Sequence, residues 1–121
     1  MNLGLVCDPS RISTKDREIV SSKVAKYSPS RLLVCRIQDD KFLHYLSSLC
    51  EQKSIALQIM KPQNIDIHSP AVIRLQALHQ AIRDMVRLCD VVLVLHPEDN
   101  RGLTLYATEV ALNMEKHLVE A

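Results

Sequence analysis

Residues 90–120 read DVVLVLHPEDNRGLTLYATEVALNMEKHLVE, and this stretch decides the fold of the chain. Its apolar run at 91–95 predicts a buried strand, the polar run after it a loop, and the residues from Thr104 or a neighbour onward a helix. In a parallel α/β sheet, anionic ligands bind where such a loop leaves a strand's carboxyl end and enters a helix. The stretch therefore indicates where a ligand would bind, but it contains no motif that names a reaction.

The same alternation of strand and helix runs through the rest of the chain. Further strands are predicted at 2–7, 31–37 and 55–60, and a short fifth one at 117–121. The helices between them are indicated by Ser13 with Asp16 as a capping box, by a cap at Asp39 or Asp40, and by Ser69 as a cap with Pro70 at the first helical position. The pattern predicts one α/β domain over residues 1–121: a doubly wound, Rossmann-like fold with a five-stranded, mainly parallel sheet and helices on both faces.

Each predicted helix has an apolar stripe that would face the sheet. The stripes are Ile19, Val20, Val24 and Tyr27; Phe42, Leu46, Leu49 and Cys50; Val72, Leu75, Leu78, Ile82, Met85 and Cys89; and Leu103, Ala107, Val110, Ala111 and Met114. On the longest helix the face that includes Ile73 and Ala77 is broader than one sheet contact needs. It either crosses several strands or packs partly against a second copy, as in a homodimer or a higher homo-oligomer.

Composition and charge exclude several classes of protein. A net charge of +1 gives no field that would steer the chain onto nucleic acid or an anionic membrane. No apolar run approaches the roughly 20 residues that span a bilayer. Four cysteines without a CxxC spacing, and no leader before the first strand, indicate buried thiols of a cytoplasmic protein rather than disulfides or a metal site. We expect neither a metal nor a cofactor.

The candidate binding residues lie in three predicted loops. If the strand order is 3-2-1-4-5, a crevice opens between the loops after the first and fourth strands, opposite the loop after the second. The candidates are Asp8, Ser10 and Arg11 in the first of these loops, Arg36 in the loop after the second strand, and His96, Arg101, Gly102 and Thr104 after the fourth. Guanidinium and hydroxyl groups bind phosphate or ribose oxygens, and glycine lets backbone approach a ligand. The alternatives are solvated arginines, a plain turn at Gly102 and a vestigial pocket.

The order of these features resembles a known family. The features are Ser10-Arg11 before a capped helix, Arg83-Asp84-Met85 and Cys89-Asp90 before an apolar strand, and Arg101-Gly102 with Thr104 and Ala111. Together they resemble the SLOG superfamily of Rossmann-like proteins over nearly the whole chain. As the resemblance implies, its members bind nucleotides or nucleotide-derived signals; they include cytokinin-activating phosphoribohydrolases, sensor domains of bacterial defence systems and the fold of the DNA-processing protein A.

The chain departs from the family at two glycine positions. Cys35-Arg36-Ile37-Gln38-Asp39 stands where such proteins have a glycine-rich turn, and Leu103 interrupts the later glycine-threonine pair. Without these glycines the backbone cannot approach a phosphate as closely, so Arg36 would have to supply the donors instead. The departure favours binding over catalysis.

Three functions remain open. The favoured one is non-enzymatic binding of a small phosphorylated nucleotide or nucleotide-derived signal, for sensing or sequestration. The second is an enzyme that hydrolyses or transfers the N-glycosidic bond of a nucleotide, for which Glu109 is the one weak catalytic candidate, although its helical spacing favours an exposed position at a lip. The third is a scaffold or inhibitor that acts through a protein surface.

Overall fold

The structure is a computed structural model that describes residues 1–7, 12–35, 40–63, 65–66, 68–96 and 102–121. The elements along the chain are β1 (Asn2–Val6), α1 (Thr14–Tyr27), β2 (Arg31–Cys35), α2 (Asp40–Gln52), β3 (Ala56–Met60), α3 (Ala71–Leu88), β4 (Val91–Val94), α4 (Gly102–Asn113) and β5 (His117–Glu120). The predicted strands and helices are therefore present, with ends that differ from the expected ones by one or two residues.

The five strands form one sheet in the order β3-β2-β1-β4-β5, and every pair is parallel. In the centre of the sheet, Leu3 of β1 lies opposite Leu32 of β2 on one side and Val91 of β4 on the other. The strand order and the parallel direction predicted from the sequence are confirmed. The chain order reverses between β1 and β4, which makes this pair of strands the topological switch point.

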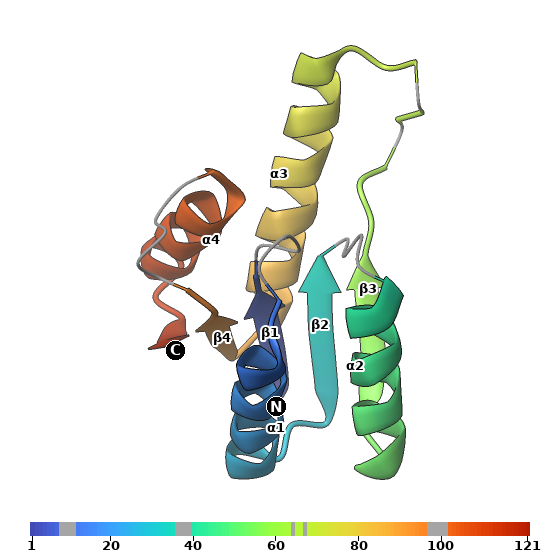
Figure 1. The fold of residues 1–121 in the computed structure, drawn as a ribbon. Coiled ribbons are helices and arrows are strands. Elements are labelled where there is room, and N and C mark those ends of the chain that lie inside the picture. The colour runs from blue at the N-terminus through green and yellow to red at the C-terminus, as the bar shows by residue number, and fades with distance from the viewer. Residues whose placement is uncertain (8–11, 36–39, 64, 67, 97–101) are drawn as a thin grey trace.

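Helices cover both faces of the sheet, so the doubly wound arrangement is confirmed (Figure 1). One face packs against α1 and α2 through Val20, Val24, Phe42, Leu46, Leu49 and Cys50; the other packs against α3 and α4 through Ala107, Val110, Ala111, Ile82, Met85 and Val86. Successive residues of the central strands alternate between the two cores: Leu3 and Leu5 lie in the first, Val6 in the second.

Helix α3 is longer than the sheet it packs against. Its 18 residues span about 27 Å at 1.5 Å per residue, whereas the 5 residues of β2 span about 17 Å. The described residues buried on α3 begin at Ala81, and the half before it rises past the ends of β1 and β2 (Figure 1). Two expectations were therefore wrong: Val72 and Leu75, predicted to face the core, are 65% and 50% exposed.

The predicted start of α3 was also wrong by one residue. Pro70 is the cap residue rather than the first helical residue, because its ψ of 148° is extended, and no side chain caps this helix. The Ser69 hydroxyl instead accepts a hydrogen bond from the Asp66 backbone N–H at 3.0 Å, within the turn that precedes the helix. By contrast, the capping box of Ser13 with Asp16 at the start of α1 is confirmed.

Gly4 lets α3 approach β1 closely. A Cβ atom at this position would lie 2.5 Å from Cys89 Sγ and 3.8 Å from Met85 Cε. Carbon and sulfur do not pack at 2.5 Å, so a side chain here would force α3 and β1 apart. The glycine inside this strand thus has a packing role.

Among the described residues, no helix is both long enough and apolar enough to cross a membrane.

Candidate functional site

The switch point sends its two loops to opposite faces of the sheet. The chain leaving β1 enters α1 on one face, and the chain leaving β4 enters α4 on the other face. In doubly wound sheets, ligands bind at such a place, outside the carboxyl ends of the two strands. The candidate site is therefore described from the residues that end β4 and begin α1 and α4.

Asp16 and His96 join the start of α1 to the end of β4. His96 Nε2 lies 2.9 Å from Asp16 Oδ1 and 3.0 Å from Oδ2, although the two residues are 80 positions apart in sequence. Asp16 Oδ2 also accepts the Ser13 backbone N–H at 2.8 Å, and the Asp16 N–H donates to the Ser13 hydroxyl at 3.2 Å. Asp16, the partner of Ser13 in the capping box, thus also connects α1 to the end of β4.

The Asp16 carboxylate is buried and still charged at neutral pH. The residue is 2% exposed, and burial alone would raise its pKa. Hydrogen bonds from His96 and Ser13, together with the charge of His96, outweigh that effect and hold the pKa of Asp16 below its ordinary value of 3.8. The start of α1 therefore carries a negative charge of its own, so α4 is the better place for an anionic ligand.

The backbone also fixes His96. Its φ of 55° lies in the left-handed region, which histidine adopts more readily than most residues. Its N–H donates to the Ala121 carbonyl at 3.1 Å, and its side chain is 28% exposed. The imidazole is thus held at the carboxyl end of β4 with part of its surface accessible.

The start of α4 supplies the remaining described candidates. Gly102 has a φ of 53°, is exposed, and has open space where a Cβ would stand. Thr104, in the first turn of α4, is 8% exposed. The Thr108 hydroxyl donates to the Thr104 carbonyl at 2.9 Å. Gly102 therefore both makes the turn and leaves the helix start open.

Glu109 lies apart from the Asp16–His96 pair. It is exposed, as its helical spacing suggested, and lines a groove of about 340 Å³ between α3 and α4 together with Leu75, His79, Gly102, Leu105 and Tyr106. We call this the α3–α4 groove. The Tyr106 ring stacks on His79 at 4.0 Å, and its hydroxyl accepts a hydrogen bond from Arg83 at 2.6 Å. The structure thus brings Gly102 and Glu109 to one groove that neither His96 nor Thr104 lines.

The other five predicted site residues are Asp8, Ser10, Arg11, Arg36 and Arg101. They lie outside the described residues.

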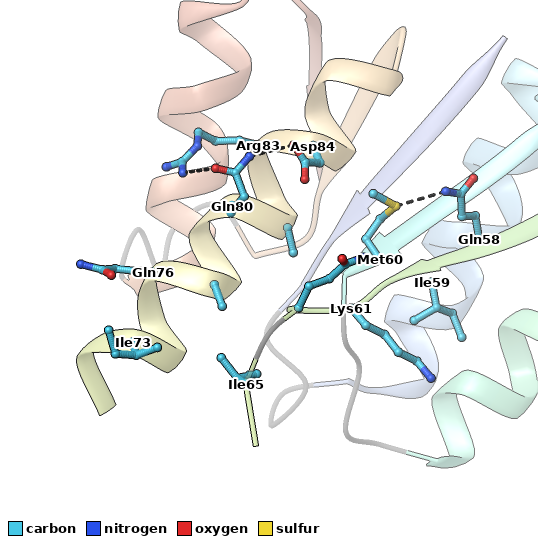
Figure 2. Close-up of a pocket in the computed structure, with 13 residues that line it drawn as sticks. Gln58, Ile59, Met60, Lys61, Ile65, Ile73, Gln76, Gln80, Arg83 and Asp84 are labelled. Carbon is cyan, nitrogen blue, oxygen red and sulfur yellow. Dashed lines mark hydrogen bonds between the residues drawn. The ribbon is translucent and has the colours of Figure 1, made fainter. Parts of the chain in front are cut away.

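A larger hollow, not foreseen from the sequence, lies between α3 and β3 (Figure 2). Its volume is about 740 Å³, and it is lined by Gln58, Ile59, Met60, Lys61, Gln63, Ile65, Ile73, Gln76, Ala77, Gln80, Ala81, Arg83 and Asp84. We call it the α3–β3 hollow. The usable signal in the sequence was Gln58, a polar residue inside a strand of a sheet covered on both faces, together with the small residues Ala77 and Ala81 on the facing helix.

Two glutamines that line this hollow are hydrogen-bonded to neighbouring side chains. Gln80 accepts a hydrogen bond from Arg83 and donates one to Asp84 at 2.8 Å (Figure 2). Gln58 accepts one from Arg31 at 2.9 Å and donates to Met60 Sδ at 3.3 Å. These contacts orient the Gln58 and Gln80 side chains.

Two of the cysteines are made unreactive by burial. None of the four is in a disulfide. Burial raises the pKa of Cys35 and of Cys89 to about 12, so both stay protonated at neutral pH. Within the described ranges, no three His, Cys, Asp or Glu side chains are grouped so that they could hold a metal ion.

No protein-family model matches the chain, and neither the curated proteins nor the solved structures give a match.

Proposed function

We propose that the chain binds a small phosphorylated nucleotide or a nucleotide-derived signal, and that it senses or sequesters this ligand without converting it. The ligand would occupy the crevice at the carboxyl ends of β1, β2 and β4. The observation that carries the proposal is the reversal of strand order between β1 and β4, where the Asp16–His96 pair joins the start of α1 to the end of β4 at 2.9 Å. The start of α4 at Gly102 adds a helix end whose first N–H groups have no partner within the helix.

The chemistry around the crevice favours binding over catalysis. His96 is paired with a buried carboxylate that also caps a helix, so Asp16 is committed to structure. Glu109, the candidate for glycosidic chemistry, is exposed in the α3–α4 groove rather than beside this pair. Glu109→Gln should therefore leave nucleotide affinity unchanged. Hydrolysis of a nucleoside monophosphate by the parent protein, lost in this variant, would favour the enzyme instead.

Arg11 and Arg101 provide the direct test, because the sequence places one in the loop after β1 and the other in the loop after β4. Each guanidinium would make a charge-assisted hydrogen bond to the same phosphate, worth about 1.5–3 kcal/mol. Replacing either by alanine should weaken binding of a nucleoside monophosphate about ten-fold or more, as measured by calorimetry. The double variant should show coupling between the two sites. Unchanged affinity in both single variants would remove this site.

We also propose that the chain self-associates through the amino-terminal half of α3. Val72, Ile73 and Leu75 are 65%, 45% and 50% exposed, and Arg74 is the only charged residue between 69 and 82. Exposed apolar side chains with few charges are typical of the centre of a protein interface. Light scattering coupled to size exclusion should give a dimer for the parent and a monomer for Leu75→Glu. Leu112→Glu, at a 58% exposed leucine on α4, is the matched control.

A cytoplasmic location is part of the same proposal. It is supported by the buried thiols of Cys50 and Cys89, which form no disulfide, because a reducing compartment keeps thiols reduced.

A further inference from the structure

We propose that the α3–β3 hollow is the subsite for the nucleobase of the bound nucleotide, with the phosphate at the switch point. The inference rests on the proposed function for the position of the phosphate. It adds a second binding region, built entirely from described residues, and a class of ligand: a nucleotide whose base enters a slot between a helix and an edge strand.

The position of the hollow fits a single extended ligand. It lies at the carboxyl end of β3, on the same edge of the sheet as the crevice. β3 is separated from β1 by β2 alone, so the two strand ends are about 10 Å apart at 4.8 Å per strand spacing. A nucleoside monophosphate can span that separation from its phosphate to the far edge of its base.

The walls of the hollow suit the face of a planar ring. The apolar lining consists of Met60 and Ile65 on the chain that leaves β3, and Ile73, Ala77 and Ala81 on α3. The two alanines leave room between the helix and the strand that larger side chains would fill. Its volume of about 740 Å³ lies in the range of small-molecule sites. Bases are held in proteins by such apolar contact on the ring face together with hydrogen bonds at the ring edge.

Two amide side chains offer those edge contacts. Gln63 and Gln76 line the hollow and are exposed, and within the described residues neither amide has a hydrogen-bond partner. Each carries both a donor and an acceptor, which is the combination that base edges present. Gln58 and Gln80 already hydrogen-bond to other side chains, so we do not expect them to bind the edge of the base.

The charges of the hollow argue against a phosphate in the same place. Asp84 lines it, and its Oδ1 atom lies 3.5 Å from Arg87 and accepts the Gln80 amide. Arg83 is committed to Gln80 and to the Tyr106 hydroxyl. Lys61, the other cation of the lining, directs its amino group away from α3 (Figure 2). The hollow therefore has no cluster of positive charge facing α3, and a neutral ring is unaffected by the charges present.

The test compares ligands that carry or lack a base. In calorimetry we expect adenosine or guanosine 5′-monophosphate to bind the parent protein at least about ten-fold more tightly than ribose 5-phosphate. Ala77→Leu, which fills the hollow, should remove that advantage and leave the affinity for ribose 5-phosphate unchanged. Gln76→Ala should weaken nucleotide binding by about three- to ten-fold, the loss of one hydrogen bond.

Two controls make the same kinds of change away from the hollow. Ser47→Leu adds an apolar side chain to the exposed side of α2, and Gln52→Ala truncates an exposed glutamine at the end of that helix. Both should bind like the parent. Thermal unfolding and circular dichroism confirm that each variant is folded, and Gln76→Ala, at an exposed position, keeps the test valid if Ala77→Leu does not fold.

The outcomes separate the two proposals. Equal affinity of the parent for nucleotides and ribose 5-phosphate, or unchanged nucleotide binding by both hollow variants, overturns the base subsite and leaves the phosphate site standing. Binding of adenosine alone that is lost in Ala77→Leu, with no contribution from phosphate, supports the hollow and overturns the switch-point site. Absence of binding by every compound overturns both.

Discussion

The amino-terminal turns of α1 and α3 both lie on the carboxyl side of the sheet, and they are built in opposite ways. At the start of α1 a reciprocal capping box closes the helix, and its Asp16 is 2% exposed and bonded to His96. At the start of α3 no side chain caps the helix, and Val72 in its first turn is 65% exposed. The start of α1 is held by tertiary contacts, whereas the start of α3 projects beyond the sheet.

The difference shows that the lengths of the helix and of the sheet together decide which part of an apolar stripe is buried. On α3 the stripe is continuous in sequence, but the sheet supports only its carboxyl-terminal half. Burial there stabilises the fold, whereas the same kind of side chain in the other half is left for a ligand or a partner. Four predictions test this comparison.

The largest contrast should lie within α3. Met85→Ala removes a fully buried side chain and should lower the free energy of unfolding by about 2–5 kcal/mol. Leu75→Ala, at a half-exposed position, should lower it by less than about 1 kcal/mol. Urea unfolding of both variants, compared through the midpoint at constant slope, measures the difference. Equal losses would mean that both halves of α3 are equally supported.

Gly4→Ala should destabilise the fold by about 1–3 kcal/mol, because the added methyl group meets Cys89 Sγ in the supported half of α3. Cys89→Ala removes that sulfur. The double variant should therefore be more stable than the sum of the two single effects predicts, which a double-mutant cycle detects. Strict additivity would show that the two atoms do not compete for space.

Asp16→Asn should lower stability by about 1 kcal/mol at neutral pH, since it weakens the cap and the contact to His96. The folded protein holds the pKa of Asp16 below 3.8, so the carboxylate stabilises the fold above that pH and loses this effect as the pH falls through its folded pKa. The gap between parent and variant should therefore close in acid. A gap that stays constant between pH 7 and pH 3 would contradict the ion pair.

The smallest effect is expected at the projecting end. Val72→Gln replaces a 65% exposed side chain with a better helix former and should change the free energy of unfolding by less than about 0.5 kcal/mol. Chemical denaturation at low protein concentration measures it on the unassociated chain. A loss of several kcal/mol would show that this turn is packed.

Local patterns in the sequence predicted the sheet because strand runs and helix stripes depend on neighbouring residues. The same periodicity could not separate Val72 from Met85, since it shows which residues share a stripe but not where the sheet under them ends. The Ser13–Asp16 box was visible for the same local reason. Its partner His96 was not, because that contact depends on β1 and β4 being neighbours. The α3–β3 hollow was not predicted, because the spacing of apolar residues indicates which side chains are buried but not how much space small residues such as Ala77 and Ala81 leave open.

The pairing of β1 with β4 also sets the order in which the molecule can assemble. The Asn2 N–H donates to Asp90 Oδ2, 88 positions further along the chain, so the middle of the sheet joins segments from opposite ends. During synthesis β1, β2 and β3 can pair first, but one side of β1 stays open until residues 91–94 have been made. At about 5–20 residues per second that interval lasts a few seconds. The strand that borders the crevice in the folded molecule is thus a temporary sheet edge on the ribosome, and the place where the nascent chain is most exposed to mispairing.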